Sequence, residues 1–341
     1  MSSFISIIIP HWNGIDVLSE CLDSLKNSTY QHKEIIVVDN ASSDGSQDWI
    51  KANHPDIILI ENNQNFGYAG GCNRGVSTAK GKWLLFLNND TIQEEDWLEH
   101  LANAVIDQKD VVAVQPKIRN YYNQSLFDYA GGAGGHIDLF CYPFAKGRIF
   151  LDQEEDSGQY DTVEDIFWAS GTAIMVHKDT FEKAGKFDET FFAHQEEIDL
   201  CWRLHLMGKR IVYEPNAVVY HKNAVSLPMN SFRKYYLNHR NSFFMLLTNY
   251  NAPLTLYLFP VRLMLEFVAL VYAFVKWDLR HFGAVCKSLL WLLTHPLAIL
   301  KKRQFVKRIR IKNDNELLKN VYRGSIIFDH YIRGIKKYSE L

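Results

Sequence analysis

The first candidate for chemistry is the stretch LLFLNNDT, residues 84–91, in which an apolar run ends in two amides, a carboxylate and a hydroxyl. Asn88, Asn89 and Asp90 offer hard oxygen ligands, which magnesium and manganese prefer. A divalent ion held there would neutralise charge as a diphosphate departs. The same residue types also form ordinary turns, so the stretch is a candidate ligand site only because it follows a predicted buried strand.

A second candidate is FFAHQEEIDLCWRL, residues 191–204, which places three carboxylates at the expected start of a helix: Glu196, Glu197 and Asp199. Acids favour a helix N-terminus through the helix dipole alone. So dense a group, preceded by a histidine and aromatic residues, nevertheless favours a functional carboxylate. A single general base would serve a sugar hydroxyl that loses its proton as it attacks.

Polar residues also follow the first two predicted strands. The first strand runs into His11, Trp12 and Asn13, and the second ends in VVDNASSDGS, residues 37–46. Asp39 would accept a hydrogen bond from a nucleobase N–H or a ribose hydroxyl. The alternative is a turn followed by a helix cap, since the serines and Asp44 also cap the next helix well.

The third loop of this kind is NQNFGYAGGCNRG, residues 63–75. Its glycines let the backbone approach a ligand, and the following helix offers its N-terminus and Arg74 to phosphate oxygens. A glycine turn set by packing alone is the other interpretation. The loop is not a dinucleotide fingerprint, and the sequence has no Walker lysine motif. His221, after the apolar run VVY, would ligate the same metal or be a satisfied core residue.

The elements that must position these residues alternate short β-branched strands with helical patterns, which indicates βαβ units and a mostly parallel sheet. The predicted strands are Ser6–Pro10, Glu34–Asp39, Asp56–Ile60 and Trp83–Leu87. The predicted helices between them are Val17–Ser28, Ser46–Asn53 and Ala69–Ala79. Ligands bind outside the carboxyl ends of such strands. Further along the chain we predict a strand near Ile166–Val176 and a helix over Glu196–Met207.

Composition supports a globular protein with a sizeable core, because 47% of the 341 residues are hydrophobic. The formal net charge of -2 argues against a nucleic-acid partner. Five widely spaced cysteines without a C-x-x-C pair predict reduced thiols and no zinc site. The N-terminal stretch MSSFISIIIP lacks a basic segment and a long apolar run, which favours a cytosolic catalytic part.

Taken together, IIIPHWNG, VVDNASSDGS, NFGYAGGCNRG, LLFLNNDT, ASGTAIMVHKDTFEKAGKFDETFF and HQEEIDLCWRL resemble glycosyltransferase family 2, especially its rhamnosyltransferase-like bacterial members. The resemblance runs from Ile5 to His221. It implies a GT-A fold, a Rossmann-like, mostly parallel mixed sheet flanked by helices. It also implies transfer of a sugar from a nucleoside-diphosphate donor with inversion at the anomeric carbon.

The resemblance also implies roles for residues. Asp90 and His221 would be metal ligands for Mn²⁺ or Mg²⁺, although Asn88 stands where many members carry Asp. Glu197 would be the catalytic base, with Glu196 and Asp199 as acceptor-side or helix-start carboxylates. The donor nucleotide would contact Pro10, Trp12, Asn13, Asp39, Asn40, Asp44, Asn65, Gly67, Asn73, Arg74 and Asn89.

The C-terminal third predicts apolar helices. Residues 253–277 are long enough to span a bilayer but contain Pro260, Arg262 and Glu266, and residues 282–300 contain Lys287 and His295. The basic block KKRQFVKRIRIK, residues 301–312, favours helices resting on, or embedded in, the anionic cytosolic leaflet of the plasma membrane. The alternative is a helical subdomain packed on the sheet. We therefore predict a catalytic domain over residues 1–230 and a helical, membrane-associated region over 231–341.

The predicted function is transfer of a sugar from a UDP- or dTDP-sugar to a hydroxyl of a glycan or lipid-linked saccharide, in cell-surface polysaccharide synthesis. Two alternatives remain open from the sequence. A sugar nucleotidyltransferase shares the nucleotide-binding architecture, although PHWNGIDV lacks its glycine-rich basic signature. A membrane-associated protein that binds nucleotide sugars without turnover is the non-enzymatic alternative.

Overall fold

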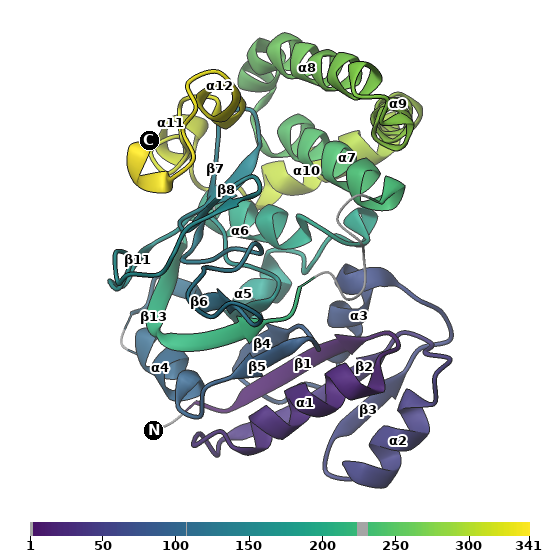
Figure 1. The fold of residues 1–341 in the computed structure, drawn as a ribbon, viewed down its shortest axis with the longest axis vertical. Helices are drawn as coiled ribbons and strands as arrows, with labels where there is room; N and C mark the ends of the chain where they lie inside the picture. The colour runs from purple at the N-terminus through teal and green to yellow at the C-terminus, as the bar shows by residue number, and fades with distance from the viewer. Residues whose placement is uncertain (1–2, 107, 224–230) are drawn as a thin grey trace.

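The computed structural model describes residues 3–106, 108–223 and 231–341. Within these ranges the main sheet has nine strands in the order β11-β13-β6-β12-β4-β1-β2-β3, with β5 paired to β13 (Figure 1). One half is parallel, as predicted, and contains β1 (Ile5–His11), β2 (Lys33–Asp39), β3 (Ile58–Glu61) and β4 (Trp83–Leu87). Because β4 and most of β1 are buried, their apolar runs carry no alternation.

The other half of the sheet is mixed. Strand β12 (Ala173–His177) runs antiparallel to both β4 and β6 (Val111–Asn120). Strand β13 (Arg210–His221) is parallel to β6 and ends against β5 (Thr91–Gln93). The short β11 (Glu164–Asp165) forms the edge. The predicted strand near Ile166–Val176 is therefore present only from Ala173, because Trp168 bonds instead to Gly135 of a second sheet.

Helices cover the sheet on both faces. They are α1 (Ile15–Lys26), α2 (Ser46–Asn53), α3 (Gly67–Gly75), α4 (Trp97–Ala104), α5 (Lys178–Lys183) and α6 (Glu196–Leu206), with a 3₁₀ turn at Glu189–Phe191. Helix α3 begins and ends earlier than predicted. The predicted mixed α/β fold class is confirmed.

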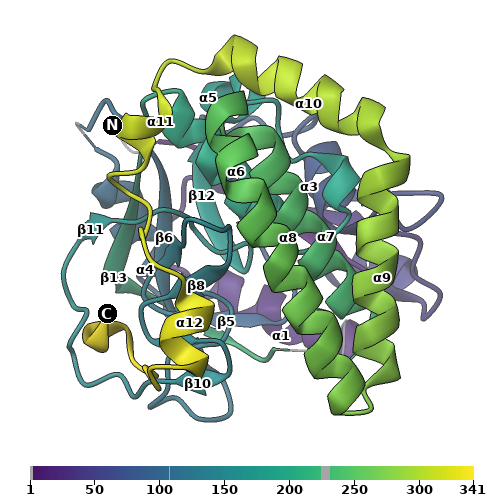
Figure 2. The same ribbon diagram turned by 90° about the horizontal axis from the view of Figure 1, so that it is seen from above.

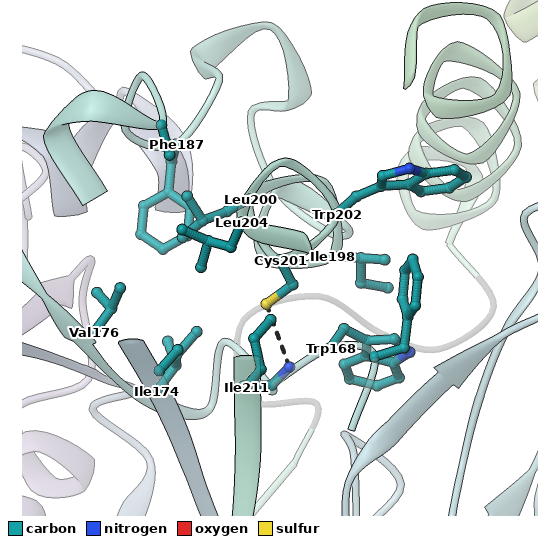
Figure 3. Packing of buried hydrophobic residues seen from close by; sticks show 14 of the residues in the cluster. Trp168, Ile174, Val176, Phe187, Ile198, Leu200, Cys201, Trp202, Leu204 and Ile211 are labelled. Carbon is teal, nitrogen blue, oxygen red and sulfur yellow. Dashed lines mark hydrogen bonds between the residues drawn. The ribbon is translucent and has the colours of Figure 1, made fainter. Parts of the chain in front are cut away.

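Helix α6 is buried on nearly every side, which fixes the carboxylates at its start. Figure 3 shows Ile198, Leu200, Cys201, Trp202 and Leu204 projecting from it into the apolar cluster. The Cys201 thiol accepts a hydrogen bond from the backbone N–H of Ala169 at 3.4 Å. The cysteines at 21, 72, 141, 201 and 286 are free thiols, as predicted.

A smaller sheet with strand order β10-β9-β8-β7 lies beside the main one. Its strands are β7 (Gly135–Ile137), β8 (Pro143–Ala145), β9 (Arg148–Ile149) and β10 (Asp152–Gln153). The chain's last elements are α11 (Asp314–Leu317), α12 (Ile326–Tyr331) and a 3₁₀ turn at Tyr338–Glu340. Helix α12 is anchored on this sheet because Ile326 N–H donates to Asp138 at 3.0 Å and the rings of Phe150 and Tyr331 lie tilted against each other with centroids 5.4 Å apart.

The predicted C-terminal helices are α7 (Phe232–Asn249), α8 (Ala252–Val275), α9 (Leu279–Thr294) and α10 (Pro296–Ile309). Helices α7, α8 and α9 lie side by side, and α8 and α9 form the outer layer (Figures 1 and 2). Buried side chains of α7 belong to the same apolar cluster as those of α6. The predicted domain boundary at residue 230 lies outside the described residues.

In helix α8 the charged side chains are buried and most apolar side chains are exposed, the reverse of the usual arrangement. Its charged residues Arg262 and Glu266 are fully buried and lie 2.5 Å apart as an ion pair, whereas most of its apolar side chains face outward. These exposed residues, here called the α8 apolar face, are Leu256, Tyr257, Phe259, Val261, Met264, Phe267, Val268, Val271, Tyr272, Phe274 and Val275. Of the described helices, α8 alone is long and apolar enough to cross a membrane, while α9 and α10 would qualify only as one span bent by 71°.

Candidate active site

The ends of β1, β4 and β13, the start of α6 and the helices α7, α8 and α12 enclose one cavity of about 1040 Å³. The predicted site residues that line it are Pro10, Trp12, Asn40, Asn65, Gly67, Asn88, Asn89, Asp90, Glu196, Glu197 and His221. The structure thus brings together residues from six predicted segments. Their meeting point is the carboxyl edge of the sheet, where open α/β folds bind ligands.

Asp90 and His221 meet because the strand after Asp90 pairs with the last strand of the sheet. Thr91 of β5 stands opposite His221 of β13, and Lys222 N–H donates to the Asp90 carbonyl at 2.9 Å. This ladder brings His221 Nε2 to 3.2 Å from Asp90 Oδ1. On the other side of the ring, His221 Nδ1 lies 2.8 Å from the buried carboxylate of Asp128. The result is a carboxylate–histidine–carboxylate row.

The electrostatics of this row are strong because all three groups are buried. Burial lowers the pKa of His221, but the carboxylates of Asp90 and Asp128 outweigh this effect and raise the pKa to about 10. Burial likewise raises the pKa of Asp90, but the charge of His221 brings it below its usual value. Without a metal ion, His221 is therefore an imidazolium at neutral pH, and a metal ion would have to displace its proton.

The geometry of the pair fits a divalent ion. Asp90 Oδ1 is buried and lies 3.2 Å from His221 Nε2, and no other group of the described residues donates a hydrogen bond to it. Two ligands that bind one ion at right angles, each at about 2.1 Å, stand about 3 Å apart. The described residues contain no group of three or more His, Cys, Asp or Glu arranged for a metal. Such an ion would therefore need further ligands from water or a diphosphate.

Two adjacent carboxylates begin α6 and face the same cavity. Glu196 is buried, whereas Glu197 is only partly so. Burial raises the pKa of Glu196 well above its usual range, and the charge of Glu197 raises it further. Burial also raises the pKa of Glu197, to about 7, although backbone N–H groups at the helix start counteract it. Glu197 is thus the better proton acceptor near neutral pH.

The first strand's end is tied to the candidate metal site through His11. Its Nδ1 lies 2.9 Å from the amide nitrogen of Asn89, and its Nε2 lies 2.8 Å from Ser46 Oγ. The Asn40 amide donates to the Gly67 carbonyl at 3.2 Å, which holds the third loop against the second. Trp12 is 47% exposed at the rim of the cavity.

Asp39 is buried at the end of β2 and does not line the cavity. Its Oδ1 accepts hydrogen bonds from Ser42 N–H and the Gln47 amide, and its Oδ2 has no partner among the described residues. Asn13 and Asp44 bind backbone N–H groups of neighbouring turns, which agrees with the turn-and-cap alternative.

Three further predicted residues also lie away from the cavity. Asn73 bonds to the backbone of Phe187, and Arg74 packs over Phe66 and lies 3.5 Å from Glu189. The expected contact of Arg74 with a diphosphate therefore has no support in this geometry. Asp199 points from α6 toward Lys302 of α10 and Arg203, at 2.7 and 2.9 Å. It stands at the helix start, as predicted, and ties α6 to α10.

The sequence interpretation missed Asp128, Tyr129, Arg148, His194 and Lys234, which lie in or beside the site. Asp128 and Tyr129 stand directly before the glycine-rich stretch AGGAGG, residues 130–135. His194 lies within the stretch FFAHQEEIDLCWRL but was assigned no role of its own, whereas Arg148 and Lys234 come from separate segments and follow no motif. Only the cavity brings them together.

The fold defines a class of protein. The structure superposes on GalNAc-T7, solved with UDP, GalNAc and Mn²⁺, with a TM-score of 0.56, 16% identity and coverage of 70% of this chain and 47% of that one. It also superposes on the mannosyltransferase PcManGT of Pyrobaculum calidifontis, solved with GDP-Man and Mn²⁺, with a TM-score of 0.52, 17% identity and coverage of 94% and 87%. The chain therefore has the GT-A glycosyltransferase fold.

The family follows from the sequence comparison. Residues 6–134 match the family described as Glycosyl transferase family 2. Glycosyltransferase GlyG of Streptococcus pneumoniae is 27% identical over 242 residues, which cover 68% of this chain and 75% of that protein. Poly-beta-1,6-N-acetyl-D-glucosamine synthase of Staphylococcus aureus is 28% identical over 219 residues, which cover 63% of this chain but 48% of the synthase. Residues 6–134 thus match the glycosyl transferase family 2 model, and the predicted resemblance to this family is confirmed.

Proposed function

We propose that this protein is an inverting, metal-dependent glycosyltransferase that moves a sugar from a nucleoside-diphosphate sugar to a hydroxyl of a saccharide acceptor. The observation that carries the proposal is the shared cavity, in which the Asp90–His221 pair and Glu197 face the same space. One end would hold the leaving diphosphate, and the other would hold a base for the incoming hydroxyl. Both groups needed for a direct displacement are then present.

The donor side is supported by the strand ends. Oδ2 of Asp39, which has no hydrogen-bond partner among the described residues, is an acceptor suited to a nucleobase N–H or a ribose hydroxyl. Trp12 offers an exposed ring directly after His11, the residue that pairs with Asp39 across β1 and β2. GalNAc-T7 and PcManGT were solved with UDP and GDP-Man respectively, which supports a nucleotide-sugar donor, UDP- or dTDP-linked by the prediction above.

In the proposed step, Glu197 accepts the proton of the acceptor hydroxyl. The hydroxyl oxygen forms a bond to the anomeric carbon while the bond from that carbon to the diphosphate oxygen breaks, and the diphosphate leaves with the electron pair. Attack and departure occur on opposite faces of the sugar, so the configuration inverts. No second carboxylate and no covalent sugar–enzyme intermediate are required.

A divalent ion bound by Asp90 and His221 would supply Lewis-acid stabilisation of the leaving diphosphate. Asp128 holds the ring of His221 through Nδ1, which orients Nε2 toward Asp90. Asn89 is held by His11 and keeps the loop after β4 in place. The carboxylate of Asp90 suits both Mn²⁺ and Mg²⁺, whereas the imidazole of His221 is a less usual ligand for Mg²⁺, which prefers oxygen.

Cell-surface polysaccharide synthesis is the proposed setting. The Staphylococcus aureus relative is a polysaccharide synthase by name. The α8 apolar face supports contact with lipid, because its buried ion pair leaves only apolar side chains outward along that side. Part of the basic block turns inward, since Lys302 pairs with Asp188 and Asp199. Lys301, Lys307 and Arg308 remain exposed for anionic headgroups. We place the protein at the cytosolic leaflet of the plasma membrane.

The test is a donor screen. Purified protein is incubated with several nucleotide sugars, with and without Mn²⁺, and release of the nucleoside diphosphate is measured for the wild type, Asp90→Asn and Glu197→Gln. We expect metal-dependent release that Asp90→Asn abolishes. Glu197→Gln should lower this release by about 10²-fold or more, because Glu197 would take the proton of the attacking hydroxyl or water.

Matched controls are Asp179→Asn and Glu182→Gln, two exposed carboxylates on α5 outside the cavity. Both should retain wild-type turnover. Full activity of the two site variants would overturn the site assignment. Nucleotide-sugar binding without turnover of any donor would favour a binding protein. Formation of a nucleoside triphosphate and a sugar 1-phosphate when inorganic diphosphate is added to the nucleotide sugar would favour a nucleotidyltransferase.

A further inference from the structure

The cavity extends well beyond the residues that the proposed reaction uses. Away from the strand ends it passes between α8 and α12, and it is lined there by apolar side chains from both helices. We call this part the apolar arm; its residues are Leu265, Val268, Ala269, Tyr272, Ile327, Phe328, Tyr331 and Ile332. Such an apolar lining does not match a nucleotide or a free sugar, because both ligands are polar.

The arm is continuous with the outside of the molecule. Val268 and Tyr272 line the arm and are each 54% exposed on the α8 apolar face. On the other wall, Tyr331 and Ile332 are 62% and 71% exposed. A hydrocarbon chain that lies between α8 and α12 would therefore reach the surface at the side that we assign to the membrane.

Two buried cations line the same cavity as the arm. Arg148 of β9 and Lys234 of α7 both approach the ring of Tyr129, at 4.5 and 5.4 Å from its centroid. Their exposed fractions are only 7% and 8%. Two like charges this close and this buried disfavour each other, and burial together with Arg148 lowers the pKa of Lys234.

Arg148 has no neutralising partner among the described residues. No carboxylate lies within ion-pair distance of it there, its Nε has no hydrogen-bond partner, and its Nη1 donates to the Phe150 carbonyl. The contrast is Arg262, which also lines the cavity but is neutralised by Glu266 at 2.5 Å. A buried, unneutralised guanidinium that faces a cavity is suited to an anionic ligand.

We propose that Arg148 and Lys234 bind the phosphate of a lipid-linked saccharide acceptor, with its hydrocarbon chain in the apolar arm and its sugar toward Glu197. Such a molecule is polar, anionic and apolar in that order along its length. The cavity has a surface suited to each part: Glu197 for the sugar, the two buried cations for the phosphate and the apolar arm for the hydrocarbon chain. This proposal deepens the proposed function and rests on it for the acceptor role, whereas binding of the lipid phosphate is independent of it.

The donor diphosphate is the competing source of a phosphate at these cations. The experiment therefore begins with UDP and Mn²⁺ at saturating concentration, so that the donor site is filled. Binding of farnesyl diphosphate, farnesol and inorganic diphosphate is then measured by calorimetry on the full chain. We expect farnesyl diphosphate to bind at least about tenfold more tightly than either part alone, because only it uses both the cations and the arm.

Variants separate the two halves of the site. Arg148→Gln should weaken farnesyl diphosphate binding by about tenfold, as expected for loss of a charge-assisted contact, and leave farnesol and UDP binding unchanged. Val268→Ser with Ile332→Ser should weaken farnesyl diphosphate and farnesol binding but not inorganic diphosphate binding. Arg210→Gln, an exposed arginine paired with Asp165, is the control and should change none of them.

The outcomes are distinct from those of the donor screen. If Arg148→Gln weakens UDP binding, or farnesyl diphosphate displaces UDP, the cations belong to the donor site and the proposal is overturned. Unchanged affinity of Arg148→Gln for farnesyl diphosphate also overturns it. Farnesyl diphosphate binding that follows the expected pattern in a protein without donor turnover would support the lipid-phosphate site and contradict the proposed function alone.

Discussion

At the scale of single residues, Asp128 supports the candidate metal site although it would contact the ligand His221 and not the metal ion itself. It fixes the ring of His221 from the Nδ1 side at 2.8 Å. We predict that Asp128→Asn weakens Mn²⁺ binding by roughly 10–100-fold, the usual effect of losing such a partner. Calorimetric titration of Mn²⁺ in the presence of UDP would measure it.

The control for this change is Asp165→Asn, an exposed carboxylate on β11. It should bind Mn²⁺ like the wild type. An Asp128→Asn protein with wild-type Mn²⁺ affinity would show that His221 does not need this support.

The second prediction at this scale concerns pH. Burial raises the pKa of Glu197 to about 7, and a base works only when ionised. The rate should therefore rise with pH and level off above about 7, and at pH 6 kcat/KM should be about tenfold below the plateau. Initial rates with saturating Mn²⁺ between pH 5.5 and 8.5 test this, with Glu182→Gln expected to keep the profile. A flat profile would mean that another group accepts the proton.

The sequence identified those site residues that end a strand or begin a helix. Asp90, Glu197 and His221 all stand at such ends, where chain direction and side-chain type together indicate chemistry. Asp128 and Arg148 could not be found in this way, because their roles depend on which loops the smaller sheet brings to the cavity. Long-range packing of that kind leaves no local periodicity to read.

At the scale of elements, the start of α3 depends on a close approach that only glycine allows. Gly67 has a φ of +72°, and a Cβ there would lie 2.3 Å from the Phe192 carbonyl oxygen. Gly45 has a similar φ of +85° but no atom within 4 Å of such a Cβ. The two positions therefore separate the cost of the backbone conformation from the cost of the contact.

We predict that Gly45→Ala lowers the free energy of unfolding by about 1–2 kcal/mol, the cost of a left-handed conformation. Gly67→Ala should lose about 1–3 kcal/mol more, because the loop at Phe192 must move. Urea unfolding followed by circular dichroism measures both. Equal losses would show that the approach of α3 to this loop is looser than the structure indicates.

The sequence also predicted most elements, and the failures have physical reasons. The buried parallel strands end within two residues of their predicted positions, because a continuous β-branched run bounded by turn residues is a strong signal. The strand expected from Ile166 failed because Trp168 pairs with the second sheet. The charges in α8 counted against a membrane-spanning helix, but Arg262 and Glu266 neutralise each other inside the protein.

At the scale of the whole molecule, the α8 apolar face should bind lipid. We predict that the double substitution Phe267→Glu and Val271→Glu reduces binding to vesicles that contain anionic phospholipid by roughly tenfold or more, because both side chains are exposed there and a charge opposes burial in lipid. Vesicle flotation measures it. Neither residue lines the cavity, so donor turnover in detergent should persist.

Val163→Glu is the control for this prediction, since Val163 is 52% exposed but lies far along the chain from α8, before β11. It should float with vesicles as the wild type does. If the double variant floats equally well, the face that contacts the membrane lies elsewhere.

The pairing of β5 with β13 also has a consequence for folding. Asp90 leaves the ribosome long before His221, and the two meet only when the sheet's late strand pairs beside β5 and β6. Contacts so distant in sequence form slowly, because a long loop must close first. The parallel strands β1 to β4 can assemble early, but the candidate metal site cannot form on a nascent chain until β13 has been synthesised. A partly synthesised or truncated chain would therefore bind no metal ion at this site and turn over no donor by the proposed mechanism.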